Sequence, residues 1–266
     1  MDLTVSVVSH HHGSDVHALL TRMADEGGRW PQRVIVTLNV PEPTLRERLG
    51  CRDWPFELVW VDNDRPAGFG ANHNRAFQRD AELSPSAFFA VLNPDIGWQR
   101  DPFHAMLSDI ECASEVGMAY PVQLGPDGRL QDHERLVPTP ARLWARYKPG
   151  GAQNEVPDGM RPEWVNGAFM LFRQQAYAQI AGFDEAYYMY GEDVDLCLRL
   201  QLAGWQIVRS DNAVVEHSAR RASRRELRHF FWHVTSLWRL WRSPVWRAWC
   251  QYRNGAYDLD RLRKWP

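Results

Sequence analysis

The sequence predicts an α/β fold in which a mostly parallel central sheet is flanked by helices. Short apolar runs alternate with helix-like segments through the first half of the chain, which is the pattern of strands joined by crossover helices. Polar side chains directly follow three of these runs, and ligands bind at that edge of such sheets. The 266 residues, of which 44% are hydrophobic, suffice for one large α/β domain or two small ones.

Each expected element is bounded by polar or turn-forming residues. The expected strands are short apolar runs, and the expected helices carry apolar residues at helical spacing. Strands are expected at 3–9, 33–39, 56–62, 87–92 and 117–121, and helices at 15–25, 44–49, 71–79, 102–115 and 174–180.

The segment 123–161 is rich in proline and glycine and carries scattered charge. We therefore expect a long irregular excursion there, serving as a flexible lid or acceptor loop. Regular structure is expected to return at 164–172. Two further short strands are expected at 207–208 and 213–216, directly before His217.

The composition argues against several classes of function. The net charge of −2 gives no general attraction to nucleic acid or membrane, and no nucleic-acid-binding module is recognisable. The four cysteines are far apart and form no CxxC pair, which argues against structural zinc or a disulfide framework and fits a reducing cytosol. Neither a signal-peptide pattern nor an apolar run of membrane-spanning length is present, so we expect a cytoplasmic protein.

Two short motifs follow expected strands. The histidines at 10–12 are expected to lie in a strand-end loop, and a metal site is the alternative. The loop 68–74 contains two glycines before a helix, so its residues, Gly70 and Asn74 among them, are candidates for binding a phosphate at a helix N-terminus. The loop lacks the third glycine of a dinucleotide fingerprint, and the chain has no P-loop and no Gly-x-Ser-x-Gly motif.

The segment 182–200 packs five carboxylates among aromatic and aliphatic residues. From Glu192 onward it is typical of a helix start, where the partial positive charge of the first turn favours acidic side chains. A carboxylate there is well placed to act as a general base, and N-terminal capping is the alternative. Three acids within four residues repel one another, so the cluster needs a cation or a proton to compensate.

Taken together and in order, five blocks of the chain resemble the family-2 glycosyltransferases with the GT-A fold. They are VSVVSHHHG, VDNDRPAGFGANHNRAF, VLNPDI, the stretch WVNGAFMLFRQQAYAQIAGFDEAYYMYGEDVDLCLRL, and VVEH, and they span residues 5–217. The NPD form together with GFGANHNRAF is most similar to bacterial rhamnosyltransferases of cell-surface polysaccharide synthesis. The resemblance implies a Rossmann-like catalytic domain at 1–218.

The resemblance also implies how a nucleotide-sugar donor is held. Asp62 would hydrogen-bond the nucleotide base, and Ser9 would line the same pocket. Asn93-Pro94-Asp95 takes the place of the family's DxD motif, which holds a divalent cation on the diphosphate. Asn93 is a departure from that motif, whereas Asp95 keeps a hard oxygen ligand suited to Mg²⁺ or Mn²⁺. His217 stands where some members add a metal ligand, with a purely structural histidine as the alternative.

The implied reaction is the transfer of a sugar, with inversion, to a hydroxyl of a glycan or of a lipid-linked acceptor. The family's ED motif corresponds to Glu192-Asp193, and Asp193 is the expected base. The favoured donor is dTDP-rhamnose, in cell-surface polysaccharide synthesis. A non-catalytic nucleotide-sugar or glycan-binding module and a sugar-nucleotide pyrophosphorylase are the alternatives. The residues expected around the acceptor are Trp164, Asn166, Tyr190 and Asp195, with core packing as the alternative for Trp164.

After His217 the composition changes, so residues 219–266 are expected to form a basic, tryptophan-rich helical extension. Between 219 and 253 there are nine arginines and one acidic residue. Such a helix with a Trp/Phe face is typical of a helix lying on a membrane surface, which for a cytoplasmic protein would be the inner face of the plasma membrane. The alternative is that the apolar stripe packs on the catalytic domain. That stripe comprises Leu227, Phe230, Phe231, Val234, Trp238 and Trp241, flanked by arginines at 220, 221, 224, 225 and 228.

Overall fold

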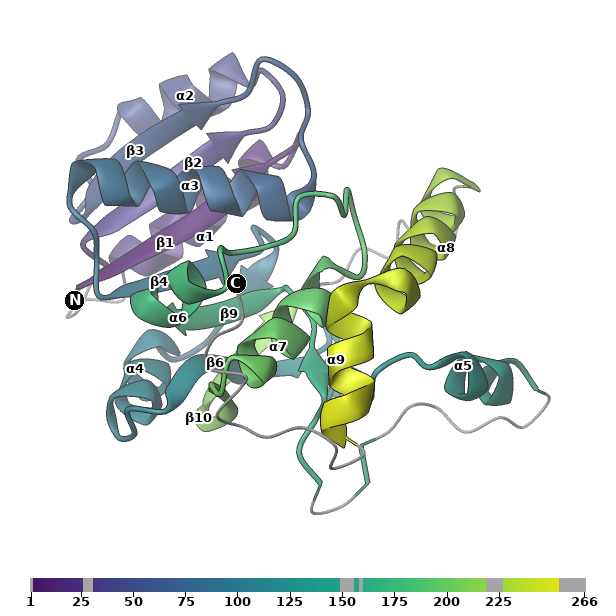
Figure 1. The fold of residues 1–266 in the computed structure, drawn as a ribbon. Helices are drawn as coiled ribbons and strands as arrows, with labels where there is room; N and C mark the ends of the chain where they lie inside the picture. The colour runs from purple at the N-terminus through teal and green to yellow at the C-terminus, as the bar shows by residue number, and fades with distance from the viewer. Residues whose placement is uncertain (1, 26–30, 149–155, 158–159, 219–226, 254–266) are drawn as a thin grey trace.

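The computed structural model describes residues 2–25, 31–148, 156–157, 160–218 and 227–253. Within them the chain forms an α/β fold with a large central sheet and helices on both of its faces (Figure 1). The strands are β1 (Leu3–Ser9), β2 (Arg33–Leu38), β3 (Glu57–Asp62), β4 (Phe88–Leu92), β5 (Ile96–Gly97), β6 (Val116–Leu124), β7 (Glu134–Arg135), β8 (Trp164–Val165), β9 (Phe169–Arg173) and β10 (Gln206–His217).

The central sheet has eight strands in the order β3-β2-β1-β4-β9-β6-β10-β5. Strands β3, β2, β1 and β4 are parallel neighbours, so their carboxyl ends meet at one edge. Strand β9 runs antiparallel between β4 and β6, and the short β5 runs antiparallel to β10. A second sheet pairs only β7 with β8. The mostly parallel sheet expected from the sequence is confirmed, and its common edge is where the candidate site forms.

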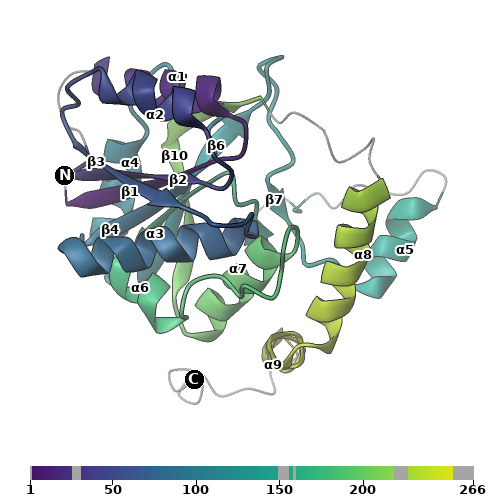
Figure 2. The same cartoon turned by 90° about the horizontal axis from the view of Figure 1, so that it is seen from above.

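Helices cover both faces of the sheet, as seen from above in Figure 2. One apolar cluster joins α1, α2 and α4 to the sheet, and a second joins its other face to α3, α6, α7 and α9. The helices are α1 (Gly13–Asp25), α2 (Pro43–Gly50), α3 (Phe69–Leu83), α4 (Phe103–Glu111), α5 (Pro140–Tyr147), α6 (Gln174–Gln179), α7 (Glu192–Leu202), α8 (Leu227–Arg242) and α9 (Pro244–Arg253).

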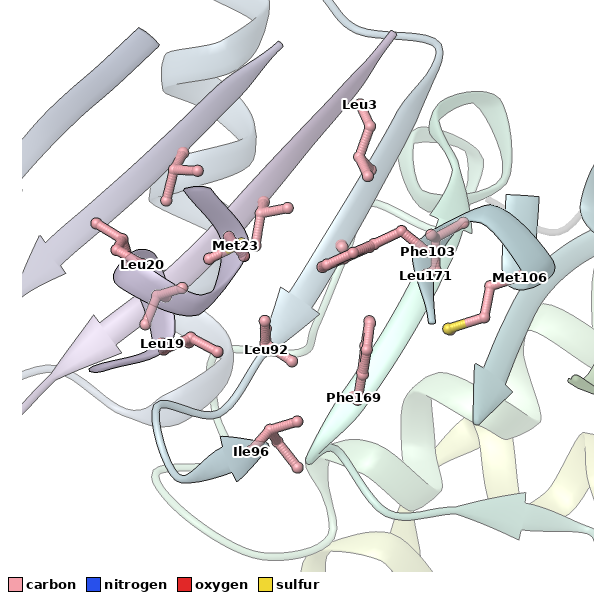
Figure 3. Close-up of a cluster of buried hydrophobic side chains, with 14 of the residues drawn as sticks. Leu3, Leu19, Leu20, Met23, Leu92, Ile96, Phe103, Met106, Phe169 and Leu171 are labelled. Carbon is pink, nitrogen blue, oxygen red and sulfur yellow. The ribbon is translucent and has the colours of Figure 1, made fainter. Parts of the chain in front are cut away.

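The central strands are buried on both sides, which explains why the sequence shows continuous apolar runs there. Figure 3 shows one of the two clusters, in which leucines of α1 and Phe103 of α4 converge on β1, β4 and β9. On the opposite face of β1, polar side chains are matched by buried partners. Thr4 Oγ1 donates to Asp80 at 2.5 Å, and Ser6 Oγ lies 2.8 Å from His73 Nδ1. These buried hydrogen bonds connect β1 to α3, and the loops at the sheet edge begin from these strands.

Two segments differ from the sequence-based expectation. The excursion at 123–161 contains the helix α5, whose Thr139 cap accepts the backbone N–H of Arg142 at 3.1 Å. The two late strands are one strand, β10, whose pairing with β6 shifts register between Ser210 and Val214. The residues at that irregularity interrupt the apolar pattern, so the sequence suggested two pieces.

The C-terminal helices pack against α7 and the second apolar cluster. Helix α9 lies along α7, and Leu240 of α8 is fully buried with Trp249 of α9 in the second apolar cluster. No helix among the described residues is long and apolar enough to cross a membrane. The arginines at 220, 221, 224 and 225 lie outside the described residues, and the side chains of Leu227, Arg228 and Phe230 are likewise not described.

Candidate active site

The side chains expected to hold the nucleotide lie at the carboxyl ends of β1 and β3. Ser9 is fully buried, and its Oγ donates to Glu42 Oε1 at 2.6 Å. Asp62 lies at the exposed rim, where Arg46 Nη2 donates to both of its oxygens at 2.8 and 2.7 Å. An exposed ion pair of this kind contributes little to stability and is readily exchanged for a ligand. Asp62 therefore stays accessible as a hydrogen-bond acceptor, with Arg46 beside it.

Three asparagines, of which only Asn72 belongs to the loop selected from the sequence, organise the segment after β3. Asn63 Nδ2 donates to Asn39 Oδ1 at 2.8 Å and to Asn72 Oδ1 at 2.6 Å. Asn39 Oδ1 also accepts the backbone N–H of Ala67 at 2.7 Å. Buried amides need partners for both their oxygen and their nitrogen. By bonding to one another, these asparagines connect the ends of β2 and β3 to the start of α3. The network therefore holds in place the segment that follows Asp62.

The glycine-containing loop before α3 has a packing role that corrects the expectation for Gly70 and Asn74. A Cβ at Gly70 would lie 2.4 Å from Phe183 Cβ, so only glycine permits the observed approach. Asn74 Oδ1 accepts the Tyr177 hydroxyl at 2.7 Å and the Phe183 N–H at 2.9 Å, and its Nδ2 donates to Phe183 O at 2.9 Å. Its polar atoms are thus bonded to the protein, and we leave both residues out of the proposed donor site.

Asp95 and His217 are brought together by strand pairing. The short strand β5 follows Asp95 and runs antiparallel to the end of β10, with His217 opposite Ile96. His217 Nε2 consequently lies 3.6 Å from Asp95 Oδ1. The preceding residue Asn93 donates its backbone N–H to Ala168 O at 2.8 Å, which anchors the turn to the chain entering β9. An aspartate and a histidine that are far apart in the sequence thus lie close together at the sheet edge.

Gln131 fixes the protonation of the His217 ring. Its Nε2 donates to the His217 carbonyl oxygen at 2.6 Å, and its Oε1 lies 3.1 Å from His217 Nδ1. A carbonyl only accepts, so the amide nitrogen must face it and the amide oxygen must face Nδ1. The proton therefore sits on Nδ1, and Nε2 presents a lone pair toward Asp95. A partner on the far nitrogen of this kind orients ligating histidines in metal sites.

The charges around His217 suit a divalent cation. Burial lowers the pKa of His217, the nearby Asp95 carboxylate opposes that effect, and His133 adds to it, so the ring is neutral as a ligand must be. Among the described residues, no group of three or more His, Cys, Asp or Glu side chains gathers into a metal-binding cluster. One carboxylate and one imidazole fit a cation that takes its other ligands from a diphosphate and water.

The acidic pair lies at the start of α7. Glu192 is buried, and its Oε2 has no hydrogen-bond partner among the described residues. Burial, followed by the neighbouring Asp193 charge, raises the pKa of Glu192 well above its ordinary value. Burial also raises the pKa of Asp193, but the Val194 N–H, at 2.9 Å, and the Arg135 charge oppose the rise. The surroundings of the two carboxylates therefore differ: Glu192 has the more strongly raised pKa, whereas a backbone N–H and the Arg135 charge favour the ionised form of Asp193.

One short strip joins the Asp95 end of the site to the Asp193 end. Gln131 contacts His217, the His133 carbonyl accepts the Asn166 N–H at 3.1 Å, and Arg135 faces Asp193. Arg135 also lies over the Trp164 ring, with Cζ 5.3 Å from the ring centroid. The sequence analysis treated this strip as part of an irregular loop, because no motif marks its residues. Only their long-range contacts show that they border the site.

Two of the expected acceptor residues lie behind that strip. Trp164 is 8% exposed, packs in the second apolar cluster and donates its Nε1–H to Leu136 O at 3.0 Å. The core-packing alternative therefore describes Trp164. Asn166 exchanges two hydrogen bonds with Gln123, at 2.9 and 3.0 Å, and its Oδ1 also accepts the Ala168 N–H. Both residues support the wall of the site, with Arg135 in front of Trp164.

Tyr190 sits in the turn that precedes the acidic pair. Its φ of 70° and that of Gly191, 83°, are left-handed, which reverses the chain and presents the N-terminus of α7. The Tyr190 hydroxyl lies 2.8 Å from His229 Nδ1, and its ring stacks on His233 with centroids 3.6 Å apart. Helix α8 thus holds a strained residue beside the expected base. That role for the C-terminal helix was not expected from the sequence.

Asp195, expected beside the acceptor, lies in a buried ion pair, which favours a structural role. It is 1% exposed, and its Oδ2 accepts Arg199 Nε at 2.6 Å. Arg199 Nη1 in turn donates to the carbonyl oxygens of Ile180, at 2.5 Å, and Gly182, at 2.7 Å. The pair therefore binds α7 to the turn at 180–182. Because α-helical residues two apart point to different faces, Asp195 is turned inward while Asp193 is partly exposed.

Comparison with known proteins gives consistent relatives. The N-acetylglucosaminyl-diphospho-decaprenol L-rhamnosyltransferase of Mycobacterium tuberculosis is 30% identical over 206 residues, covering 67% of this chain and 67% of its own. The rhamnosyltransferase WbbL of Escherichia coli K12 is 29% identical over 249 residues, covering 88% and 90%. A family model described as the N-terminal domain of galactosyltransferase matches residues 159–223.

Solved structures agree on the fold. GalNAc-T7 with UDP, GalNAc and Mn²⁺ superposes with a TM-score of 0.66 at 12% identity over 98% of this chain, which spans 53% of the GalNAc-T7 chain. The mannosyltransferase PcManGT of Pyrobaculum calidifontis, with GDP-Man and Mn²⁺, gives 0.58 at 14% identity, covering 98% and 78%. At such identities these structures establish the fold alone.

An α/β sheet with a polar carboxyl edge, faced by a buried acidic pair at a helix start, is the architecture of a nucleotide-sugar-dependent transferase. The relatives make this assignment firm: the chain belongs to the family-2 glycosyltransferases with the GT-A fold, and it is an enzyme. The named relatives within that family are bacterial rhamnosyltransferases. The resemblance noted in the sequence is confirmed, and the binding-module and pyrophosphorylase alternatives lose their support.

Proposed function

We propose that this enzyme transfers rhamnose, with inversion at the anomeric carbon, from dTDP-rhamnose to a hydroxyl of a lipid-linked or glycan acceptor in cell-surface polysaccharide synthesis. Support for the sugar comes from two relatives named as rhamnosyltransferases, one of which is named for a diphospho-decaprenol acceptor. A deoxythymidine or uridine nucleotide fits Asp62, which presents acceptor oxygens to the N–H of a pyrimidine base. Residues 1–218 would form the catalytic domain.

The observation that carries the mechanism is the division of roles between Glu192 and Asp193. Glu192 is buried and its pKa is raised well above the ordinary value, whereas Asp193 is partly exposed and has a backbone N–H and the Arg135 charge to favour its ionised form. Asp193 then takes the proton from the acceptor hydroxyl as that oxygen attacks the anomeric carbon. The nucleoside diphosphate leaves from the opposite face, so one displacement inverts the configuration.

A divalent cation is proposed at Asp95 and His217, beside the donor diphosphate. When bound, it would offset the charge that develops on the leaving diphosphate. The chain's own part is to supply the Asp95 oxygens and the His217 Nε2 lone pair, which Gln131 keeps free of a proton. Solved neighbours of the same fold contain Mn²⁺, which supports testing that ion first. Asn93 and Ser9 would complete the donor pocket.

The direct test is Asp193→Asn. Loss of a general base lowers turnover about 10²–10⁴-fold, while donor affinity is expected to stay unchanged because Asp193 acts on the acceptor. Turnover is measured with a lipid-linked acceptor, and donor affinity by calorimetry. Glu82→Gln serves as the control, since Glu82 is an exposed carboxylate that pairs with Arg79 on α3. Retention of more than a tenth of the wild-type turnover in Asp193→Asn would remove Asp193 as the base.

The donor is tested separately, by calorimetry with dTDP-rhamnose, uridine-diphosphate sugars and guanosine-diphosphate sugars. The pyrimidine nucleotides are expected to bind and the purine nucleotide is not. Asp62→Ala should weaken the pyrimidine donors without changing the fold, because the Asp62 side chain is exposed and pairs with the exposed Arg46. Tight binding of the guanosine donor alone would contradict the proposed nucleotide.

A further inference from the structure

Helices α5 and α8 expose large apolar side chains that the catalytic site does not use. The exposed fractions are 71% for Trp144 of α5, and 65%, 47% and 59% for Phe231, Val234 and Trp238 of α8. On α8 these three residues recur at intervals of three and four, so they lie on one stripe of the helix. Large exposed apolar side chains gathered on neighbouring helices are unusual for a surface in contact with water only.

The two helices stand on the same side of the molecule. Both project from the body on the side away from α3 in Figure 1, and the view turned by 90° in Figure 2 shows them together again. They are linked where α5 begins, because Trp241 Nε1 of α8 donates to Pro138 O at 2.8 Å. The exposed residues of α5 and α8 therefore belong to one region, which we call the two-helix face. It comprises Trp144, Arg146, Lys148, Phe231, Val234, Trp238 and Arg242.

The charged side chains of these helices are all basic, and one acidic residue, Asp184, lines the same pocket as Trp238 and Arg242. Helices α5, α8 and α9 contain no acidic residue, and the exposed side chains beside the aromatics include Arg146, Lys148 and Arg242. The Arg242 guanidinium lies over the Trp238 ring, with Cζ 5.3 Å from its centroid, so a cation and an aromatic ring are presented together. A cationic, aromatic face complements a surface that is anionic outside and apolar beneath.

We propose that the two-helix face docks on the surface of an anionic lipid bilayer. The proposal deepens the proposed function, because a lipid-linked acceptor would lie in that bilayer. Tryptophan favours the boundary between headgroups and acyl chains, and Arg and Lys side chains reach the phosphates there. The apolar side chains project from two separate helices, which suits shallow insertion into a plane.

Docking in this orientation also bears on catalysis, because the other side of α8 holds the turn before the acidic pair. Ser236 Oγ donates to Met189 O at 3.1 Å, and Tyr190 contacts His229 and His233 of the same helix. The helix is therefore a rigid connection between the bilayer surface and the residues that precede Asp193. A lipid-linked sugar would meet the enzyme close to its base.

The test is co-sedimentation of the full chain with vesicles, without donor or acceptor. Vesicles of phosphatidylglycerol and phosphatidylcholine are compared with vesicles of phosphatidylcholine alone. The double variant Trp144→Ser/Trp238→Ser should bind the anionic vesicles at least about tenfold more weakly. The matched control is Leu83→Ser, an exposed apolar residue at the end of α3, which should bind as the wild type does.

A charge test is independent of the aromatic one. Each cation near an anionic surface strengthens binding about fivefold at low salt, so Arg146→Glu/Lys148→Glu should weaken binding at least about 25-fold and flatten its salt dependence. Arg48→Glu on α2 is the control for a change of net charge alone. Because the test variant reverses two charges, the control also carries Arg100→Glu, which makes the change in net charge equal. All of the substituted side chains are exposed, so unchanged thermal unfolding is expected and is checked first.

Equal pelleting of the wild type and the tryptophan variant would overturn the proposal, as would equal binding to neutral and anionic vesicles. Binding of the wild type to a protein partner that the tryptophan variant loses, without any vesicle binding, would overturn it as well. The outcome is separable from the proposed function. A wild type that binds vesicles but transfers no sugar supports the docking face and contradicts the reaction.

Discussion

Breaking the buried Asp195–Arg199 pair is the sharpest test of how α7 is held. The change Asp195→Asn removes the carboxylate that accepts Arg199 Nε at 2.6 Å, in a pair whose residues are 1% and 9% exposed. Burial raises the pKa of Asp195 more than Arg199 lowers it, so the pair itself is no large source of stability. Removing one partner nevertheless leaves the guanidinium buried with only backbone carbonyls beside it.

The expected loss is about 3–5 kcal/mol of unfolding free energy, the usual cost of an uncompensated buried charge. For a chain of this size that corresponds to a fall in Tm of at least about 6 °C. Glu82→Gln is the matched control, because Glu82 pairs with Arg79 on the same helix but both side chains are largely exposed. That change should cost under about 1 kcal/mol. Thermal and urea unfolding of the two variants measure the difference.

The same variant decides between the two roles considered for Asp195. A structural role predicts a lower Tm and, under conditions where the variant is folded, a KM for the acceptor close to that of the wild type. A role in acceptor binding predicts an unchanged Tm and a raised KM for the acceptor. If Asp195→Asn keeps a Tm within about 1 °C of the wild type while the acceptor KM rises, the structural reasoning is refuted.

Three further outcomes are expected. Because folding raises the pKa of Glu192, the wild type loses stability as the pH rises from the ordinary glutamate pKa through the raised value. Glutamine does not titrate, so the Tm of Glu192→Gln should rise relative to the Tm of the wild type with increasing pH. A Tm difference that is independent of pH would contradict the assignment. Gln131→Leu should redistribute the ring proton of His217 and weaken Mn²⁺ binding, read by nitrogen NMR and by titration without donor; an unchanged tautomer would contradict the assignment. Gly70→Ala should lower Tm, because the added methyl group would overlap Phe183 and force one of the two segments to move. An unchanged Tm would show that this movement costs no stability.

The strands could be predicted because each is a local apolar run. Strands β1, β2 and β4 are buried along their whole length, so burial alone sets the pattern that the sequence displays. The start of α7 was also predictable, since acidic residues crowd one turn. In each case the signal lies within a few consecutive residues.

The strip from Gln131 to Arg135 could not be predicted in this way. Gln131 acquires its role through a contact with His217 that spans 86 residues of sequence, and no local pattern announces such a bond. Helix α5 was missed because it is short and lies within a proline- and glycine-rich segment, which lowers any local helix signal. Asp195 and Asn74 were misassigned because motif resemblance gives positions but not the directions of side chains.

The contact between the glycine-containing loop and the 182–188 turn has a consequence for folding during synthesis of the chain. Phe183 packs on Gly70, and Asn74 bonds to it across 109 residues, so one wall of the site is contributed by segments made early and late in synthesis. An emerging chain would carry α3 with its glycine face uncovered until the later segment arrives. Contacts of such large sequence separation slow folding. Catalytic competence should therefore appear only once nearly the whole domain has left the ribosome.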